Sequence, residues 1–288
     1  MMNSQRTGSA AGGQRISWKL VVCISFLAAL FLIAIFAPIL APNDPYLQFL
    51  DARLIPPGGI SPNGTWHLLG TDHLGRDYLS RLIYGSRVTL LIGFVVVIIA
   101  GFIGTVIGIC AGYFGGWLDQ ALMFVINARL ALPIVLAFLA VVVVFGPSLQ
   151  STIIALGVLL WDRFAVVVRS ATQQIRQQEY ILAAKGLGMS ELSILIKEVL
   201  PNLAPAIAVV ATIEMGGAIL LESSLSFLGF GVQEPTPSWG LMLAQAKEQI
   251  FFDSWLIYIP GLAILSVVLA VNTLGDNLSS HFESEARP

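Results

Sequence analysis

Long uncharged apolar runs most constrain how this chain can fold. Residues 20–43 and residues 130–161 contain no charged side chain. A run of about 20 such residues crosses the hydrocarbon of a bilayer as a helix, in which every backbone amide is paired. Over the whole sequence 56% of residues are hydrophobic and 11% are charged, whereas a soluble domain carries about 25% charged residues. These runs predict an all-α integral membrane protein.

The apolar runs divide into about six expected membrane-spanning helices. Residues 130–161 are too long for one helix, and Gly146 and Pro147 are expected to break them, because Gly and Pro interrupt helices. Pro260 is a candidate kink in the last span. The expected spans are residues 20–41, 88–112, 121–145, 150–169, 203–227 and 255–275.

Positive charge before the first span sets the expected orientation. Arg6, Arg15 and Lys19 precede this span without any acidic residue, and such segments stay in the cytoplasm. The span is too long for a signal-peptide core, so we expect it to be retained. Six spans then place both termini in the cytoplasm. The expected main parts are a cytoplasmic tail at 1–19, a transmembrane domain at 20–278 and a cytoplasmic tail at 279–288. The transmembrane domain is expected to include an outer segment at 42–87, a cytoplasmic loop at 170–202 and an outer loop at 228–254.

Charge and cysteine usage argue against several classes of protein. The net charge is −2 and the chain has no basic stripe, so a nucleic-acid partner is not expected. Cys23 and Cys110 lie in apolar runs without a Cys or His at ligand spacing, which indicates small core residues. His67 and His73 have no evident third ligand. We therefore predict no metal site and no cofactor in this chain.

The outer segment is expected to end in a helix at the membrane surface. Thr71 or Asp72 is predicted to cap this helix by accepting hydrogen bonds from its free N–H groups. One face is apolar and the other polar, which is typical of an interfacial helix. The apolar residues are Tyr78, Leu79, Leu82 and Ile83, and the polar ones are Arg76, Asp77, Ser80 and Arg81. The polar face is either simply solvated or part of an outer mouth.

The outer loop is rich in Gly and Pro between residues 229 and 240, which argues against a regular helix there. Trp239 is expected at the membrane interface, where an apolar ring with a polar N–H is stable. The loop is either an ordinary connection or a wall of the outer mouth.

The cytoplasmic loop suits the docking of a partner, because a loop that only connects two spans needs a few residues. Two short helices are predicted from Glu179 onward, hinged at Gly186 and Gly188, which tolerate unusual backbone angles. Ser190 is expected to cap the second helix. Pro201 is expected to end it and to open the next span.

Small and charged residues inside the spans carry two further expectations. Gly104, Gly108 and Gly112 recur every four residues, a spacing that lets helices approach closely in lipid. Arg129 is expected to pair with Asp162, or else with Glu214, because a lone charge in the membrane is costly. The alternative is that the long Arg129 side chain reaches the cytoplasm.

The cytoplasmic loop resembles the signature of binding-protein-dependent ABC importer permeases. The family pattern is Glu-Ala-Ala, three residues, Gly, nine residues, then Ile-x-Leu-Pro. Ala183 and Ala184, Gly188, and Leu200 with Pro201 match it, whereas Leu182 replaces the Glu and Glu198 the Ile.

More specifically, the chain is similar to the second permease of dipeptide and oligopeptide importers over residues 18–280. The matching stretches are Leu69-Gly70-Thr71-Asp72, Gly75-Arg76-Asp77, Ser80-Arg81, Gly85-Ser86-Arg87, Gly112-Tyr113-Phe114-Gly115-Gly116, Leu225-Ser226-Phe227-Leu228-Gly229-Phe230-Gly231, Pro237-Ser238-Trp239-Gly240, and Asn272 with Leu274-Gly275-Asp276. Nickel and metal-chelate importers share these motifs, so they remain an alternative to peptide import.

The resemblance implies a type I ABC importer architecture in the bacterial cytoplasmic (inner) membrane. It implies a homologous second permease, two ATPase subunits that bind ATP and Mg, and a solute-binding protein outside. Asp72, Arg76, Asp77 and Trp239 would lie on the binding-protein side. This chain has no Gly-x-x-x-x-Gly-Lys-Ser/Thr loop for ATP phosphates, so it is expected to be a transporter subunit and not an enzyme. Alternating access, driven through the loop at 179–201, is the expected mechanism.

Two other classes of function are alternatives to this one. A membrane enzyme would need a nucleophile with its base, or a metal site, but Gly-x-Ser-x-Gly and His-Glu-x-x-His motifs are absent. An autonomous carrier driven by an ion gradient remains open, because Asp162 and Glu214 lie within spans, where acids relay protons.

Overall fold

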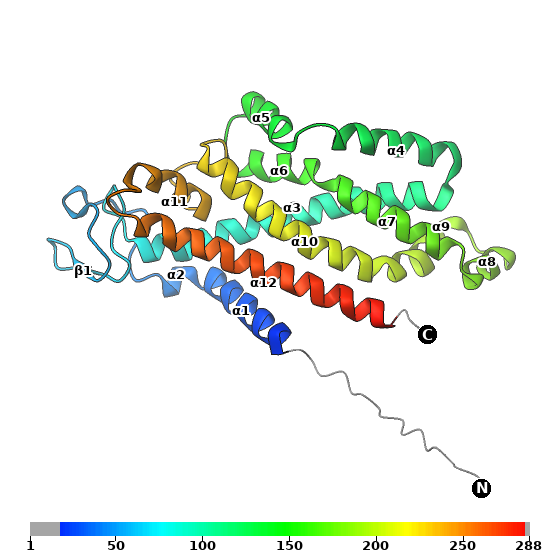
Figure 1. The fold of residues 1–288 in the computed structure, drawn as a ribbon, viewed down its shortest axis with the longest axis horizontal. Coiled ribbons are helices and arrows are strands. Elements are labelled where there is room, and N and C mark those ends of the chain that lie inside the picture. Colours follow the sequence, from blue (N-terminus) through cyan, green and yellow to red (C-terminus); the bar gives the residue numbers. More distant parts are fainter. Residues whose placement is uncertain (1–17, 286–288) are drawn as a thin grey trace, which may run out of the picture.

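The computed structural model describes residues 18–285 as long helices lying side by side, with an irregular segment at one end (Figure 1). The described chain begins with α1 (Trp18–Ile35) and α2 (Ala37–Leu40). The irregular segment then holds a 3-10 turn (Leu50–Ala52) and a small antiparallel sheet of β1 (Gly59–Ile60) and β2 (Trp66–His67). Arg6 and Arg15 of the predicted tail, and residues 286–288 of the other tail, lie outside the described residues.

The remainder of the described chain is mainly helical. Its helices are α3 (Tyr78–Phe114), α4 (Gly116–Leu130), α5 (Ile134–Phe145), α6 (Leu149–Leu159), α7 (Trp161–Arg176), α8 (Glu179–Gly186), α9 (Glu191–Ile194), α10 (Leu200–Phe227), α11 (Trp239–Ala246) and α12 (Trp255–Glu285). A π-helical turn (Leu195–Val199) joins α9 to α10, and a 3-10 turn (Lys247–Gln249) follows α11.

Among the described residues, four helical stretches are long and apolar enough to cross a membrane. They are Tyr78–Phe114, Leu149–Arg176, Glu191–Phe227 and Trp255–Ser280. A fifth crossing results if α4 and α5, bent by 83° from each other, form one broken span. The apolar stretch of α1, Leu20–Ile35, is shorter. The helical membrane class is confirmed, while a sixth crossing stays a prediction.

Prolines explain where two expected spans are interrupted. A proline nitrogen cannot complete the helical hydrogen bond to the carbonyl four residues earlier. The first expected span breaks at Phe36, two residues before Pro38, and α2 resumes at Ala37. The span expected at 121–145 is bent between α4 and α5, where Pro133 precedes the first residue of α5. The expected break at Gly146 and Pro147 separates α5 from α6.

Helix α3 begins differently from the expectation. The predicted caps, Thr71 and Asp72, lie before its start, and Asp77 is the capping residue, accepting a 2.9 Å hydrogen bond from Ser80 N–H. The expected interfacial helix and second span form one continuous helix of 37 residues. The helix leads into the second span, as expected, but the predicted caps were wrong, because Asp77 caps it in place of Thr71 or Asp72.

Pro201 does not end a helix. Ser190 caps α9, as expected, but the chain continues through the π-helical turn into α10, and Pro201 lies in the first turn of α10. Leu200 N–H bonds to the carbonyl of Leu195, five residues earlier. This wider turn joins α9 and α10 without a break, so Pro201 lies inside one continuous helical stretch.

The two ends of the bundle differ in character. Figure 1 shows α8, α9 and the end of α12 at one end, and the irregular segment with β1 and α11 at the other. Helix α3 runs between these ends and packs on α7, α10 and α6. Large apolar side chains, such as Phe102 and Phe124, are exposed on the outside of the bundle, which suits lipid contact.

Candidate functional site

The coupling segment, which we define as residues 179–194, forms one end of the bundle (Figure 1). Helix α8 buries Ile181 and Ala184 against the bundle, whereas Leu182 and Leu187 are 57% and 85% exposed. Apolar side chains outside the lipid spans favour contact with another protein. The segment therefore presents an apolar surface held on an anchored helix.

The predicted residues of the coupling segment take different places. Glu179 begins α8 and is exposed, as is Ala183, whereas Ala184 is buried. Gly186 ends α8, and Gly188 has a φ of +77°, a conformation that favours glycine. Burial raises the pKa of Tyr180 on this helix, with Glu198 adding to the shift.

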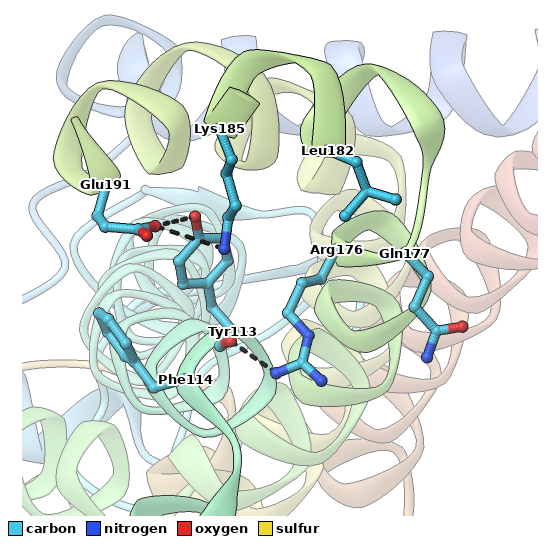
Figure 2. A pocket seen from close by; sticks show the side chains of 7 residues that line it. All are labelled: Tyr113, Phe114, Arg176, Gln177, Leu182, Lys185 and Glu191. Carbon is cyan, nitrogen blue, oxygen red and sulfur yellow. Dashed lines mark hydrogen bonds and ion pairs between the residues drawn. The ribbon is translucent and has the colours of Figure 1, made fainter. Parts of the chain in front are cut away.

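A cavity of about 460 Å³ lies beside the coupling segment, at the end of α3. Figure 2 shows the seven residues that line it, and several of them are joined by hydrogen bonds or ion pairs. The lining residues are Tyr113, Phe114, Arg176, Gln177, Leu182, Lys185 and Glu191. They come from α3, α7 with the residue that follows it, α8 and α9, so the coupling segment meets two other helices at this cavity.

The outer network, which we define as Asp72, Arg76, Arg81, Glu234 and Gln245, joins the irregular segment to the outer loop. The guanidinium of Arg76 donates to Asp72 Oδ2 at 2.7 Å and to Glu234 Oε1 at 3.0 Å. Arg81 Nη2 donates to Gln245 Oε1 at 3.1 Å. Five polar side chains thus connect three parts of the chain at the end of the bundle opposite the coupling segment.

The interpretation of the polar face as simply solvated was wrong, whereas a place in the outer mouth stays a prediction. Arg76 is 2% exposed and Arg81 is fully buried, because the irregular segment and α11 cover them. Asp77 is also buried, and one of its carboxylate oxygens lies 2.7 Å from His67 Nδ1. Beside this network, burial lowers the pKa of His73.

The ring of Trp239 does not face the lipid, in contrast to the expectation of an interfacial tryptophan. It is 1% exposed, and its Nε1 donates to the carbonyl of Leu82 at 2.9 Å. A Cβ on Gly85 would come within 2.9 Å of the indole ring, so this glycine leaves the space that the ring fills. Trp239 therefore anchors α11 to α3 inside the bundle.

The charged residues inside the spans form two ion pairs of different length. Arg129 Nη1 lies 3.9 Å from Asp162 Oδ2, at the outer limit of an ion pair, and Arg129 also donates to the Leu159 carbonyl. Glu214 pairs instead with Arg163, at 2.9 Å. The sequence reasoning missed Arg163, although it directly follows Asp162 and therefore lies at the same depth.

The glycine stripe of α3 faces α7. A Cβ on Gly108 would lie 2.8 Å from the Ala165 carbonyl, and one on Gly112 would lie 2.6 Å from the Arg169 carbonyl. Gly104 approaches the Trp161 carbonyl in the same way. The three glycines bring the backbones of α3 and α7 into contact over two helical turns.

Glu222 is a buried group that the sequence reasoning missed. Its carboxylate is fully buried in α10 and accepts hydrogen bonds from Ser226 at 2.7 Å and from Ser238 at 3.3 Å. An acid followed by serine at 223, 224 and 226 inside an apolar run was the available signal. This group links α10 to the start of α11.

Among the described residues, no three His, Cys, Asp or Glu side chains gather as a metal site would require.

Known proteins similar to this chain agree with the sequence resemblance. The family described as "Binding-protein-dependent transport system inner membrane component" matches residues 104–287. The chain is 40% identical over 253 residues to the di/tripeptide transport system permease protein DppC of Pseudomonas aeruginosa, covering 88% of this chain and 84% of the relative. It is 37% identical over 258 residues to the dipeptide transport system permease protein DppC of Haemophilus influenzae, covering 90% and 88%.

The fold also matches a solved transporter. The structure described as inward-facing conformations of the MetNI methionine ABC transporter has a TM-score of 0.56 and 20% identity, covering 69% of this chain and 95% of that chain. The resemblance to importer permeases is thus confirmed. By its matched segment and its curated relatives, the chain belongs to the family of inner membrane components of binding-protein-dependent transport systems.

Proposed function

We propose that this chain is one of two permease subunits of an ABC importer that carries short peptides across the inner membrane. The coupling segment carries this proposal, because an exposed apolar surface on an anchored helix suits the docking of an ATPase subunit. Relatives named as di/tripeptide and dipeptide permeases support the peptide as substrate. ATP and Mg are held by the partner ATPases, and a binding protein delivers the peptide.

We also propose that the coupling segment and both termini face the cytoplasm. The start of α1 and the end of α12 point towards the end of the bundle that carries α8 (Figure 1). Leu187→Cys would then react with an impermeant thiol reagent from the cytoplasmic side, and Ile60→Cys from the outer side. Both variants are made with Cys23 and Cys110 replaced by serine. The opposite labelling pattern would overturn the orientation.

Transport itself is tested in liposomes that contain both permeases, the ATPases and the binding protein. Uptake of a labelled dipeptide is expected when ATP is enclosed with the ATPases. Uptake of nickel or a nickel chelate, without dipeptide uptake, would place the chain among metal importers. Uptake by this chain alone under a proton or sodium gradient would identify an autonomous carrier.

A further inference from the structure

Tyr113, near the end of α3, contacts the coupling segment. Its hydroxyl donates a short hydrogen bond to the carboxylate of Glu191, and its ring lies under Lys185 Nζ, 4.5 Å from the centroid (Figure 2). Its backbone carbonyl accepts a 2.8 Å hydrogen bond from Arg176 Nη1. One residue, 3% exposed, thus contacts α7, α8 and α9.

These contacts hold both sides of the linker that carries Gly188. Lys185 belongs to the last turn of α8, and Glu191 is the first residue of α9. Lys185 Nζ lies 3.6 Å from Glu191 Oε2, so an ion pair connects the two helices that flank the linker. Both side chains also contact Tyr113. No described atom lies within 4 Å of a Cβ built on Gly188. The linker backbone is itself held by hydrogen bonds, from Gly188 N–H to the Lys185 carbonyl at 3.0 Å and from Met189 N–H to the Ala184 carbonyl at 3.1 Å. The side-chain cluster adds a direct connection from both flanking helices to α3.

Helix α3 leads from this cluster to the outer network. Its 37 residues extend without a break from Tyr78 to Phe114, which at 1.5 Å per residue is about 55 Å. Asp77, which caps its outer end, directly follows Arg76 of the outer network. The glycine stripe holds α3 against α7 along its inner half. A displacement of the inner end of α3 would therefore reach the outer network through one packed element.

We propose that Tyr113, Lys185 and Glu191 form a joint that carries movement of α8 into α3, and so to the outer end of the bundle. The proposal rests on the proposed function, in which α8 receives the movement of an ATPase. The three side chains are positioning residues, because they connect α8 and α9 directly to the end of α3. A hydrogen bond to an ionised carboxylate and a cation over an aromatic ring are suited to this role, since both are directional.

The test compares solute uptake with ATP hydrolysis in the same liposomes holding the complete importer. Tyr113→Phe removes one hydroxyl and keeps the ring, and Glu191→Gln removes the charge and keeps the size. In each variant, uptake per ATP hydrolysed is expected to fall about fivefold, the lower end of coupling between two sites. Tyr258→Phe is the matched control, because the hydroxyl of Tyr258 has no hydrogen bond among the described residues and its ring is exposed. A lower folded yield with an unchanged ratio would show a structural role and overturn the proposal.

A second measurement tests the joint without requiring transport. Spin labels at Ala183→Cys on α8 and Phe102→Cys on α3, with Cys23 and Cys110 replaced, report the distance between these helices in the assembled complex. Tyr113→Phe is expected to broaden this distance distribution, while Tyr258→Phe leaves it unchanged. An unchanged distribution in Tyr113→Phe would overturn the joint even if peptide uptake is observed. Broadening without any uptake by the wild type would retain the joint and refute the proposed function.

Discussion

Arg169 donates two parallel hydrogen bonds to Asp119, from Nε to Oδ1 at 2.5 Å and from Nη2 to Oδ2 at 2.6 Å. The two residues are 50 positions apart, on α7 and in the first turn of α4. Both side chains are largely covered, at 25% and 16% exposure. A two-pronged pair of this kind fixes orientation as well as distance, so it sets how α4 leaves the end of α3 and lies beside α7.

The first prediction is that Asp119→Asn lowers the thermal midpoint of the detergent-purified protein. The substitution keeps the size of the side chain but leaves the Arg169 guanidinium without its counter-charge, at a cost of about 1–3 kcal/mol. The double variant with Arg169→Gln should lose less than the sum of the two single losses, because the pair is already broken. Asp51→Asn, at an exposed acid in the irregular segment, is the matched control. Strictly additive losses would show that the pair contributes nothing.

The second prediction concerns the outer network. Arg76→Gln removes the guanidinium that bridges Asp72 and Glu234, and breaking a buried ion pair costs about 3 kcal/mol. Arg76→Lys should recover part of the loss, because it restores the charge without the fork that reaches two partners. Folded yield and thermal midpoint are the measurements.

Arg53→Gln is the control for the outer network, because Arg53 lies in the same irregular segment and is exposed. If Arg76→Gln and Arg53→Gln have equal effects, burial of Arg76 has no energetic consequence. Such a result would favour the original expectation of a solvated polar face.

How much the sequence predicts depends on how local the signal is. The membrane helices follow from apolar runs, and the contact of Gly108 with α7 follows from a spacing of four, because both patterns lie within one helix. The burial of Arg76 could not be predicted in this way, because its partner Glu234 is 158 residues away. The pairing of Asp119 with Arg169 could not be predicted for the same reason, since no local sequence pattern indicates which two helices become neighbours.

Proline shows a second limit on prediction from sequence. Pro201 was expected to end a helix, as an isolated rule suggests, yet a π-helical turn before it lets α9 and α10 continue as one element. Conversely, the bend before Pro133 divides residues 121–145, which were expected to form one span. Whether a proline bends or ends a helix depends on the packing around it, and the sequence alone does not state that packing.

The third prediction is that Gly108→Ala destabilises the packing of α3 on α7. The added Cβ would lie 2.8 Å from the Ala165 carbonyl and from Val168 Cβ, so one backbone must move, at a cost of about 1–3 kcal/mol. Gly108→Leu should lower the yield of assembled complex further. Gly217→Ala is the control, because no described atom lies within 4 Å of a Cβ at that position in α10. Equal thermal midpoints for the two alanine variants would contradict close packing of the stripe.

The last prediction concerns Gly188, between α8 and α9. Its φ of +77° is a conformation that a β-branched residue adopts at a cost of at least about 1–2 kcal/mol. Because a Cβ there would meet nothing within 4 Å beyond its chain neighbours, Gly188→Val is expected to act mainly through the backbone. The linker is expected to leave this conformation and to tilt α8 relative to α9. Stimulation of ATP hydrolysis by the loaded binding protein should then be lost in the reconstituted importer.

Gly186 provides the control for this backbone effect. It is the last residue of α8, it has no positive φ, and a Cβ there would also meet no described atom within 4 Å. Gly186→Val should therefore keep most of the stimulation that Gly188→Val loses. Gly188→Asn should lie between them, because asparagine enters the left-handed region more readily than valine. If Gly188→Val were stimulated as strongly as the wild type, the left-handed turn would not be needed for coupling, and the exposed surface of α8 alone would have to carry the signal.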